Sequence, residues 1–268
     1  MGHLCIVNAY KKYLHYRELI WSFVRRDINA RYRGTIMGVF WSVIHPLATF
    51  SVYLLVFGFF LKIRMPQSTS VLDFALYFSA GYFPWVFFSN AVTRAATCIV
   101  DNRNYIKKVA FPSEIFPFSL MLSEGVSLLI SITIVVIFSI SVHGFSFLLL
   151  LLPIVILLEM IFVLSCVLLA SAITVFFRDI PQLLNSVFMV WFWLTPIAYT
   201  VDLIPKKLEI LVFANPMHHV LALYRSMLLN SSMPNMKVLL LFTLFSLTLL
   251  YVSLLIFQRA KRHFSDLL

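Results

Sequence analysis

Long runs of apolar residues, separated by short polar segments, fill most of the chain. A helix needs about 20 mostly apolar residues to cross the hydrocarbon layer of a bilayer, so the sequence predicts a set of membrane-spanning helices. The six predicted spans are residues 36–61, 74–100, 115–140, 147–177, 183–198 and 238–257. We expect the motif GYFPW to break the second span, and the proline of LTPIAY to kink the fifth, which is the shortest.

The composition agrees with this pattern. Of the 268 residues, 61% are hydrophobic and 12% are charged, whereas soluble domains average about 45–50% apolar and about 25% charged residues. The sequence therefore predicts an all-α integral membrane protein that forms a single transmembrane domain over residues 1–268. The net charge of +10 comes from basic residues beside the apolar runs, which favours membrane topology and anionic lipid over nucleic acid as the explanation.

The loop charges predict the orientation of the chain. Most Lys and Arg residues fall in the N-terminal arm, in the loop after the second span and in the C-terminal tail. Because cytoplasmic loops carry an excess of these residues, we expect both termini in the cytoplasm, and an even number of spans agrees with that.

Residues 11–33 predict an N-terminal amphipathic helix. At about 100° per residue, an apolar face centred on Ile20 includes Phe23 and Val24, while most of the arginines point away from it. Asp27 breaks the pattern because it falls on the apolar side. Such a helix suits the headgroup layer, and the alternative is a plain positively charged anchor without a partner.

The loop over residues 101–112 joins the second and third spans and predicts a short basic and aromatic helix. Tyr105 and Ile106 would then face the cytoplasm. Apolar groups offered to water usually mark an interface, so this loop indicates a docking partner.

A second irregular segment lies between the fifth and sixth spans. Residues 205–228 are too polar in places to cross a membrane and too apolar for a free loop. Asn215 is suited to cap a helix and Pro216 to be its first residue, so we expect a helical hairpin that dips into the outer face of the membrane. The alternative is an ordinary amphipathic surface loop.

The sequence contains no motif for catalysis or metal binding. It has no phosphate loop of the form G-x-x-x-x-G-K-[ST], no G-x-G-x-x-G and no H-E-x-x-H. His218 and His219 are adjacent, so on a helix they point about 100° apart and make a poor metal pair. A chain of this kind either catalyses with scattered residues or takes its energy from a partner.

Four stretches together resemble one known family, the transmembrane subunits of bacterial polysaccharide ABC exporters of the O-antigen, capsule and teichoic-acid type. The stretches are RRDINARYRGTIMGVFWSVIHPL, SAGYFPWVFFSNAVTRAATCIVDNRNYIKKVAFPSEIFPFSLMLSE, VFFRDIPQLLNSVFMVWFWLTPIAY and NPMHHVLALYRSMLL. They occur in the family's order along nearly the whole chain. The resemblance implies a multi-pass protein of the bacterial inner membrane that exports a lipid-linked polysaccharide.

The resemblance also implies a homodimer that pairs with two copies of a separate ATPase. ATP and Mg would bind that ATPase, and this chain would hold no cofactor. The N-terminal helix would be the interface helix, the loop 101–112 would carry the coupling helix, and the hairpin 205–228 would be the periplasmic gate. The residues expected at the ATPase interface are Arg25, Arg26, Asp27, Arg31, Tyr105, Ile106, Lys107 and Lys108. Those expected at the gate are Asn215, Pro216 and Tyr224.

In this family the first and fifth spans line the channel, and both are rich in aromatic residues here. Aromatic rings can stack on the C–H faces of sugars without fixing one hydroxyl pattern, which permits a polymer to slide. Tyr53, Phe57, Phe192 and Trp193 are therefore the residues we expect along the substrate path. The alternative is that these rings form an interfacial belt or pack against lipid.

Two carboxylates, Glu124 and Glu159, lie inside predicted spans. Ionisable groups in membranes usually face protein or a water-filled cavity, so each is either a functional polar contact or a helix-packing group. Rival functions are an exporter of the same fold that carries a lipid or drug, a membrane glycosyl- or acyltransferase, and an assembly factor.

Overall fold

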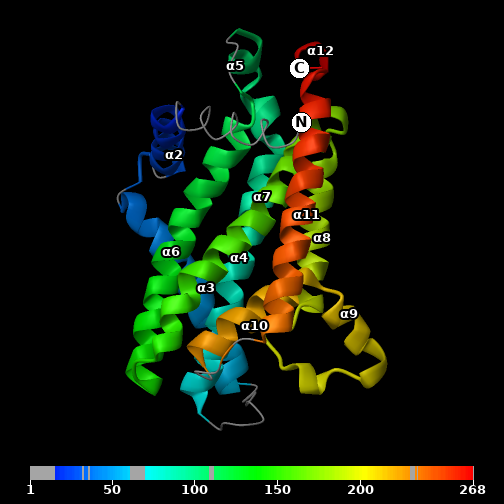
Figure 1. Ribbon diagram of the computed structural model, residues 1–268. Coiled ribbons are helices and arrows are strands. Elements are labelled where there is room, and N and C mark those ends of the chain that lie inside the picture. The colour runs from blue at the N-terminus through cyan, green and yellow to red at the C-terminus, as the bar shows by residue number, and fades with distance from the viewer. Residues whose placement is uncertain are drawn as a thin grey trace.

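The computed structural model describes residues 16–31, 33–35, 37–60, 70–108, 112–229, 233 and 235–267, and all of its regular elements there are helices (Figure 1). From the N-terminus they are α2 (Arg17–Arg31), η1 (Gly38–Phe40), α3 (Trp41–Tyr53), η2 (Leu54–Phe60), α4 (Val71–Asp101), α5 (Arg103–Lys108) and α6 (Ile115–His143). There follow η3 (Phe147–Leu151), α7 (Leu152–Phe176), α8 (Ile180–Leu194), η4 (Val201–Leu203), η5 (Lys206–Leu208), α9 (Glu209–Phe213), α10 (Pro216–Leu228), α11 (Met236–Lys261) and α12 (Phe264–Leu267).

Five helical segments are long and apolar enough to cross a membrane: Val43–Phe60, Val71–Asp101, Ile115–His143, Phe147–Phe176 and Met236–Lys261. They match the first, second, third, fourth and sixth predicted spans. The fifth predicted span corresponds to α8, which is apolar but has only 15 residues.

Two expectations about proline were wrong. The second span is not broken at GYFPW, because α4 runs as one helix of 31 residues with Pro84 inside it. Helices packed on several sides can satisfy the backbone group that a proline frees, and α4 packs against α6, α7, α8 and α10. Conversely, LTPIAY does not merely kink a helix: α8 ends at Leu194 and Thr195 is extended, since a residue before proline is pushed out of the helical region.

The chain turns sharply between α2 and α3. Gly34 and Gly38 have φ angles of 81° and 50°, a region that glycine adopts readily and other residues rarely do. The turn lets α2 lie across the end of the bundle while α3 descends along it (Figure 1).

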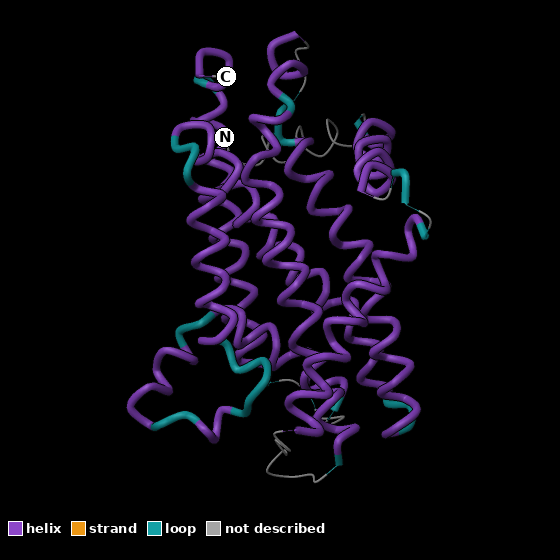
Figure 2. Tube along the Cα trace, turned by 180° about the vertical axis from the view of Figure 1, so that it is seen from behind, coloured by secondary structure: helices purple, strands orange, loops and turns teal. Residues whose placement is uncertain are grey.

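Helix α4 is the centre of the molecule. It packs most extensively against α6 and α7, and α7 in turn packs against α11. Figure 1 shows α2, α5 and α12 at one end of the bundle and α9 and α10 at the other, and Figure 2 shows the chain between α8 and α10 projecting sideways.

Helix α10 is held to the bundle by buried polar contacts on two neighbouring residues. The Tyr224 hydroxyl donates a hydrogen bond of 2.6 Å to Oε2 of Glu159 on α7, and neither side chain is accessible to solvent. The Arg225 guanidinium lies 3.5 Å from the centroid of the Tyr77 ring and donates 2.7 Å and 3.2 Å hydrogen bonds to the carbonyls of Pro196 and Ile197. α10 is therefore tied to α4, α7 and the segment after α8.

We predict that Tyr224→Phe destabilises the fold by about 1–2 kcal/mol, because the buried Glu159 loses its hydrogen-bond donor. The matched control is Tyr251→Phe, since Tyr251 is exposed on α11 and its hydroxyl has nothing comparable to lose. The measurement is the thermal unfolding midpoint of the purified protein in detergent. Equal midpoints for the two variants would contradict the proposed role of this contact.

Candidate translocation groove and its ion-pair cluster

A groove with a cavity volume of about 410 Å³ lies along α4, with α3 on one side and α8 on the other. Its lining consists of Tyr53, Trp85, Ser89, Asn90, Thr93, Arg94, Asn185, Phe188, Met189, Phe192 and Trp193. Three of the four predicted substrate-path residues, Tyr53, Phe192 and Trp193, thus come together in one place. The side chain of the fourth, Phe57, lies outside the described residues.

The aromatic rings of this groove pack against one another. The Phe192 ring centroid lies 6.1 Å from that of Tyr53, 5.9 Å from that of Trp85 and 5.3 Å from that of Trp193. Such spacings are typical of edge-to-face and offset aromatic pairs. The pairs give the groove a continuous aromatic wall that extends from α3 across α4 to α8.

The floor of the groove is polar, which the sequence analysis missed. Within the described part of the chain, the side chains of Asn90, Thr93 and Asn185 line the groove and make no hydrogen bond. The available signal was the three-residue spacing of Asn90 and Thr93, which puts both on one face of α4. Rings beside uncharged hydrogen-bonding groups suit a hydroxyl-rich ligand.

At one end of the groove, Arg94 belongs to a cluster of charged side chains from three helices, which we call the ion-pair cluster. Its Nη2 lies 2.6 Å from Oδ1 of Asp27 on α2, and its Nη1 bonds Oε1 of Glu124 on α6. Arg31 Nη2 lies 2.8 Å from Asp27 Oδ2, 3.1 Å from Glu124 Oε1 and 2.6 Å from the Ser123 hydroxyl. The Ser123 hydroxyl also donates to Asp27.

The cluster explains why Asp27 departs from the amphipathic pattern. Ile20, Phe23 and Val24 are buried as the apolar face of α2, and Asp27 lies on that face because its partners are on α4 and α6. Burial opposes ionisation of the Asp27 carboxyl, but hydrogen bonds from Arg94, Ser123 and Arg31 outweigh burial and lower its pKa. Two guanidinium groups against two carboxylates leave the cluster balanced in charge.

The structure also places Glu124 and Glu159 in different environments. Glu124 is ion-paired to Arg31 and Arg94 next to the groove. Glu159 bonds Tyr224 through one oxygen, and its other oxygen has no hydrogen-bond partner among the residues described. The sequence analysis left both a functional and a packing role open for each residue, and it gave no indication of either partner.

Of the residues expected at the ATPase interface, Asp27 and Arg31 belong to the ion-pair cluster, whereas Arg26 and Tyr105 contact each other. Arg26 stacks on the rings of Phe23 and Tyr105, 4.5 Å and 5.7 Å from their centroids, and donates to Asn102 at 3.4 Å. This contact joins α2 to the α4–α5 turn at the same end of the bundle. The side chain of Arg25 is exposed, that of Ile106 is half-buried, and those of Lys107 and Lys108 lie outside the described residues.

The expected gate residues are internal anchors in this structure. Asn215 caps α10 by accepting a 3.0 Å hydrogen bond from the Met217 amide, and the same oxygen accepts one of 3.0 Å from the Trp191 indole. Its amide donates to the Thr195 hydroxyl at 2.8 Å. Pro216 starts α10, so the residues of this corner fix the beginning of the helix against the end of α8.

Comparison with known proteins places the chain in a family. Residues 18–229 match the ABC-2 type transporter family over most of the chain. The chain belongs to the ABC-2 type transporter family. It is a membrane transport subunit, and membership of this family implies an ATPase partner.

Curated relatives cover nearly the whole chain. It is 25% identical over 264 residues to an O-antigen export system permease protein, RfbA, of Myxococcus xanthus, which spans 97% of this chain and 99% of the relative. Two proteins of the same name from Klebsiella pneumoniae are 27% and 28% identical over 254 and 255 residues, each spanning 94% of this chain and 95% of the relative.

We predict that Asp27→Asn lowers the stability of the protein by about 1–3 kcal/mol, because Arg94 and Arg31 lose a charged acceptor in a partly buried site. Since the pKa of Asp27 is lowered by folding, the stabilisation is present above the unfolded pKa of about 3.9 and is lost as the pH falls through the folded value. The difference between wild type and variant is therefore expected at neutral pH and should vanish in strong acid.

The measurement is the thermal midpoint in detergent as a function of pH. Asp179→Asn is the matched control, because Asp179 is exposed in the turn before α8. A midpoint for Asp27→Asn that equals the control at pH 7 would contradict the role assigned to the cluster.

Proposed function

We propose that this chain is the membrane-spanning channel subunit of an ATP-driven exporter that moves a lipid-linked polysaccharide of the O-antigen type out of the bacterial cytoplasm. The observation that carries the proposal is the groove, in which aromatic rings face uncharged hydrogen-bonding groups. The names of the curated relatives, which are O-antigen export permeases, support the same substrate class.

The chemistry of the groove suits a long sugar chain better than a drug or a lipid tail. Sugar rings offer apolar C–H faces to Tyr53, Phe192 and Trp193, and they offer hydroxyls to Asn90 and Asn185. No unpaired charge binds the ligand strongly at one point, because Arg94 is already bonded to two carboxylates. Weak and repeated contacts of this kind let a polymer bind and still move on.

In the proposed assembly α8 completes six spans, both termini are cytoplasmic and the chain lies in the inner membrane. A second copy closes the groove, which is open on one side in the single chain. The apolar surface that α8 exposes beside the groove supports this arrangement; it consists of Leu183, Val187, Met189, Val190, Trp193 and Leu194.

Energy enters from the ATPase subunits, which bind ATP and Mg and contact α2 and α5. Arg26 and Tyr105 join these two helices, so that they offer one continuous surface. Movement of α2 is then transmitted to α4 through the contact between Asp27 and Arg94. Because Arg94 lines the groove, the movement changes the groove as well. In this mechanism the ion-pair cluster is the mechanical connection between ATP hydrolysis and the polymer path, and α10 with the α8–α10 segment closes the outer end.

We predict that Trp193→Ala reduces polysaccharide export about fivefold, which corresponds to about 1 kcal/mol of lost aromatic contact along the path. The measurement is the amount of polysaccharide at the surface of cells that lack the native subunit and produce the variant with the partner ATPase. Tyr251→Ala is the control, because it removes an exposed aromatic residue on α11, outside the groove.

Export by Trp193→Ala at the level of the control would refute the assignment of the groove. Cells that carry the wild-type subunit and its ATPase yet export a lipid or drug in place of polysaccharide would refute the proposed substrate class.

A further inference from the structure

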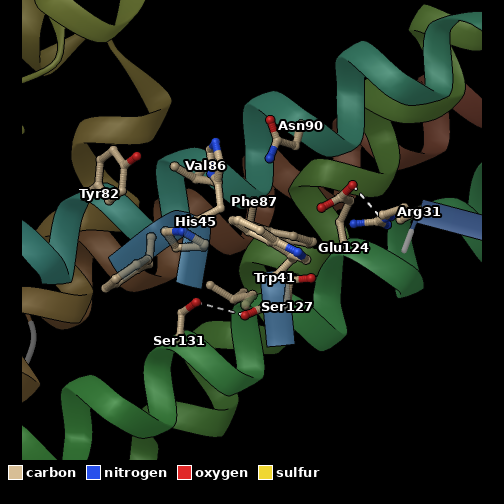
Figure 3. Close-up of a pocket in the computed structure, with 13 residues that line it drawn as sticks. Arg31, Trp41, His45, Tyr82, Val86, Phe87, Asn90, Glu124, Ser127 and Ser131 are labelled. Carbon is tan, nitrogen blue, oxygen red and sulfur yellow. Dashed lines mark hydrogen bonds and ion pairs between the residues drawn. The ribbon is translucent and has the colours of Figure 1, made fainter. Parts of the chain in front are cut away.

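A second cavity of about 360 Å³ lies between α3, α4 and α6, with Arg31 of α2 at its edge (Figure 3). No residue of α8 lines it, which distinguishes it from the groove. Asn90 lines both cavities. The volume falls within the range of about 300–1,000 Å³ that is usual for pockets of small ligands.

The lining of this cavity combines aromatic rings with hydrogen-bonding groups. Its rings belong to Trp41, Tyr82, Phe83 and Phe87. Its polar groups belong to Arg31, His45, Asn90, Glu124, Ser127 and Ser131, and Figure 3 shows them around the same space as Trp41.

Several of these polar groups have no partner. In the part of the chain that the structure describes, the side chains of Trp41, His45, Asn90 and Ser127 make no hydrogen bond. The amide of Asn90 alone can donate two hydrogen bonds and accept two. Trp41, His45 and Asn90 are exposed and Ser127 is half-buried, so their donors and acceptors are accessible to a ligand in the cavity.

The charge of the cavity narrows the chemistry of that occupant. Arg31 and Glu124 lie 3.1 Å apart and compensate each other, so the site offers neither a free cation for an anion nor a free carboxylate for a cation. A hydrocarbon tail would leave the polar groups unpaired. A neutral ring with several hydroxyls and apolar faces can stack on the aromatic residues of the lining and bond its polar groups. A sugar unit has these properties.

We propose that this cavity is a carbohydrate site, separate from the groove, that binds one neutral sugar unit of the exported polymer. The inference rests on the proposed function for the identity of the polymer. Because Arg31 and Glu124 belong both to this cavity and to the ion-pair cluster, a sugar bound there contacts the pairs that hold α2. A bound sugar therefore acts on α2, the helix that faces the ATPase, and binding of the sugar raises the rate of ATP turnover.

The test uses the complex of this chain and its ATPase in lipid nanodiscs. The probe is a set of oligosaccharide fragments, prepared by mild acid hydrolysis of the surface polysaccharide of the producing bacterium, with free glucose as the comparison. Binding is measured by saturation-transfer NMR, and ATP turnover is measured in the same samples.

Ser127→Leu removes a hydroxyl and reduces the space of this cavity while keeping every residue of the ion-pair cluster, and Asn185→Leu is the matched change in the groove. We expect Ser127→Leu to remove the stimulation of ATP turnover by the fragments, the readout that binding in the groove does not produce. Asn185→Leu should leave this stimulation intact and reduce export. Trp41→Phe, which keeps an aromatic ring but removes the indole N–H donor, should weaken the stimulation several-fold and guards against a folding defect in Ser127→Leu.

Stimulation of ATP turnover by the fragments that survives both Ser127→Leu and Trp41→Phe would overturn the inference, and so would tighter binding of free glucose than of the fragments. A phospholipid that copurifies in the cavity and is lost in Ser127→Leu would also overturn it. In each of these cases wild-type cells would still export polysaccharide, so the proposed function would stand. Absence of export by the wild-type complex would instead refute the proposed function itself.

Discussion

The arrangement of this protein depends on one arginine that bonds two carboxylates on two other helices. Arg94 projects from the central helix α4, and its two terminal nitrogens bond Asp27 on α2 and Glu124 on α6. A guanidinium group suits this task because its donors are held in a fixed planar fork. Each partner is costly to leave unpaired once it is partly buried, so the three helices are held in one relative position.

The same contact places the charged end of the bundle beside the groove. Arg94 forms part of the groove lining, and Arg31 and Glu124 form part of the second cavity. At the opposite end, Tyr224 and Arg225 fix α10 to α7, to α4 and to the segment after α8. The bundle thus has polar anchors at both ends and mainly apolar packing between them.

The apolar runs predicted most of the membrane-spanning helices, because the length and hydropathy of a segment can be read directly from the sequence. Local reasoning also put Ile20, Phe23 and Val24 on one face of α2, and these residues are buried. It was wrong about Pro84, because the packing that keeps α4 continuous comes from distant helices. It could not supply the partners of Asp27 or of Glu159, since Arg94 and Tyr224 lie 67 and 65 residues away along the chain. The polar floor of the groove joins Asn90 and Thr93 of α4 to Asn185 of α8, and the packing of α4 against α8 is not a local property of the sequence.

In the proposed mechanism the ion-pair cluster transmits the work of the ATPase to the groove. The most direct measurement is the amount of polysaccharide translocated per ATP hydrolysed by the complex in proteoliposomes, for Arg94→Gln and for the control Arg178→Gln, which changes an exposed arginine. We expect Arg94→Gln to assemble with the ATPase and hydrolyse ATP but to translocate far less polysaccharide per ATP than wild type, while the control is unchanged. An Arg94→Gln complex with the wild-type ratio would contradict it.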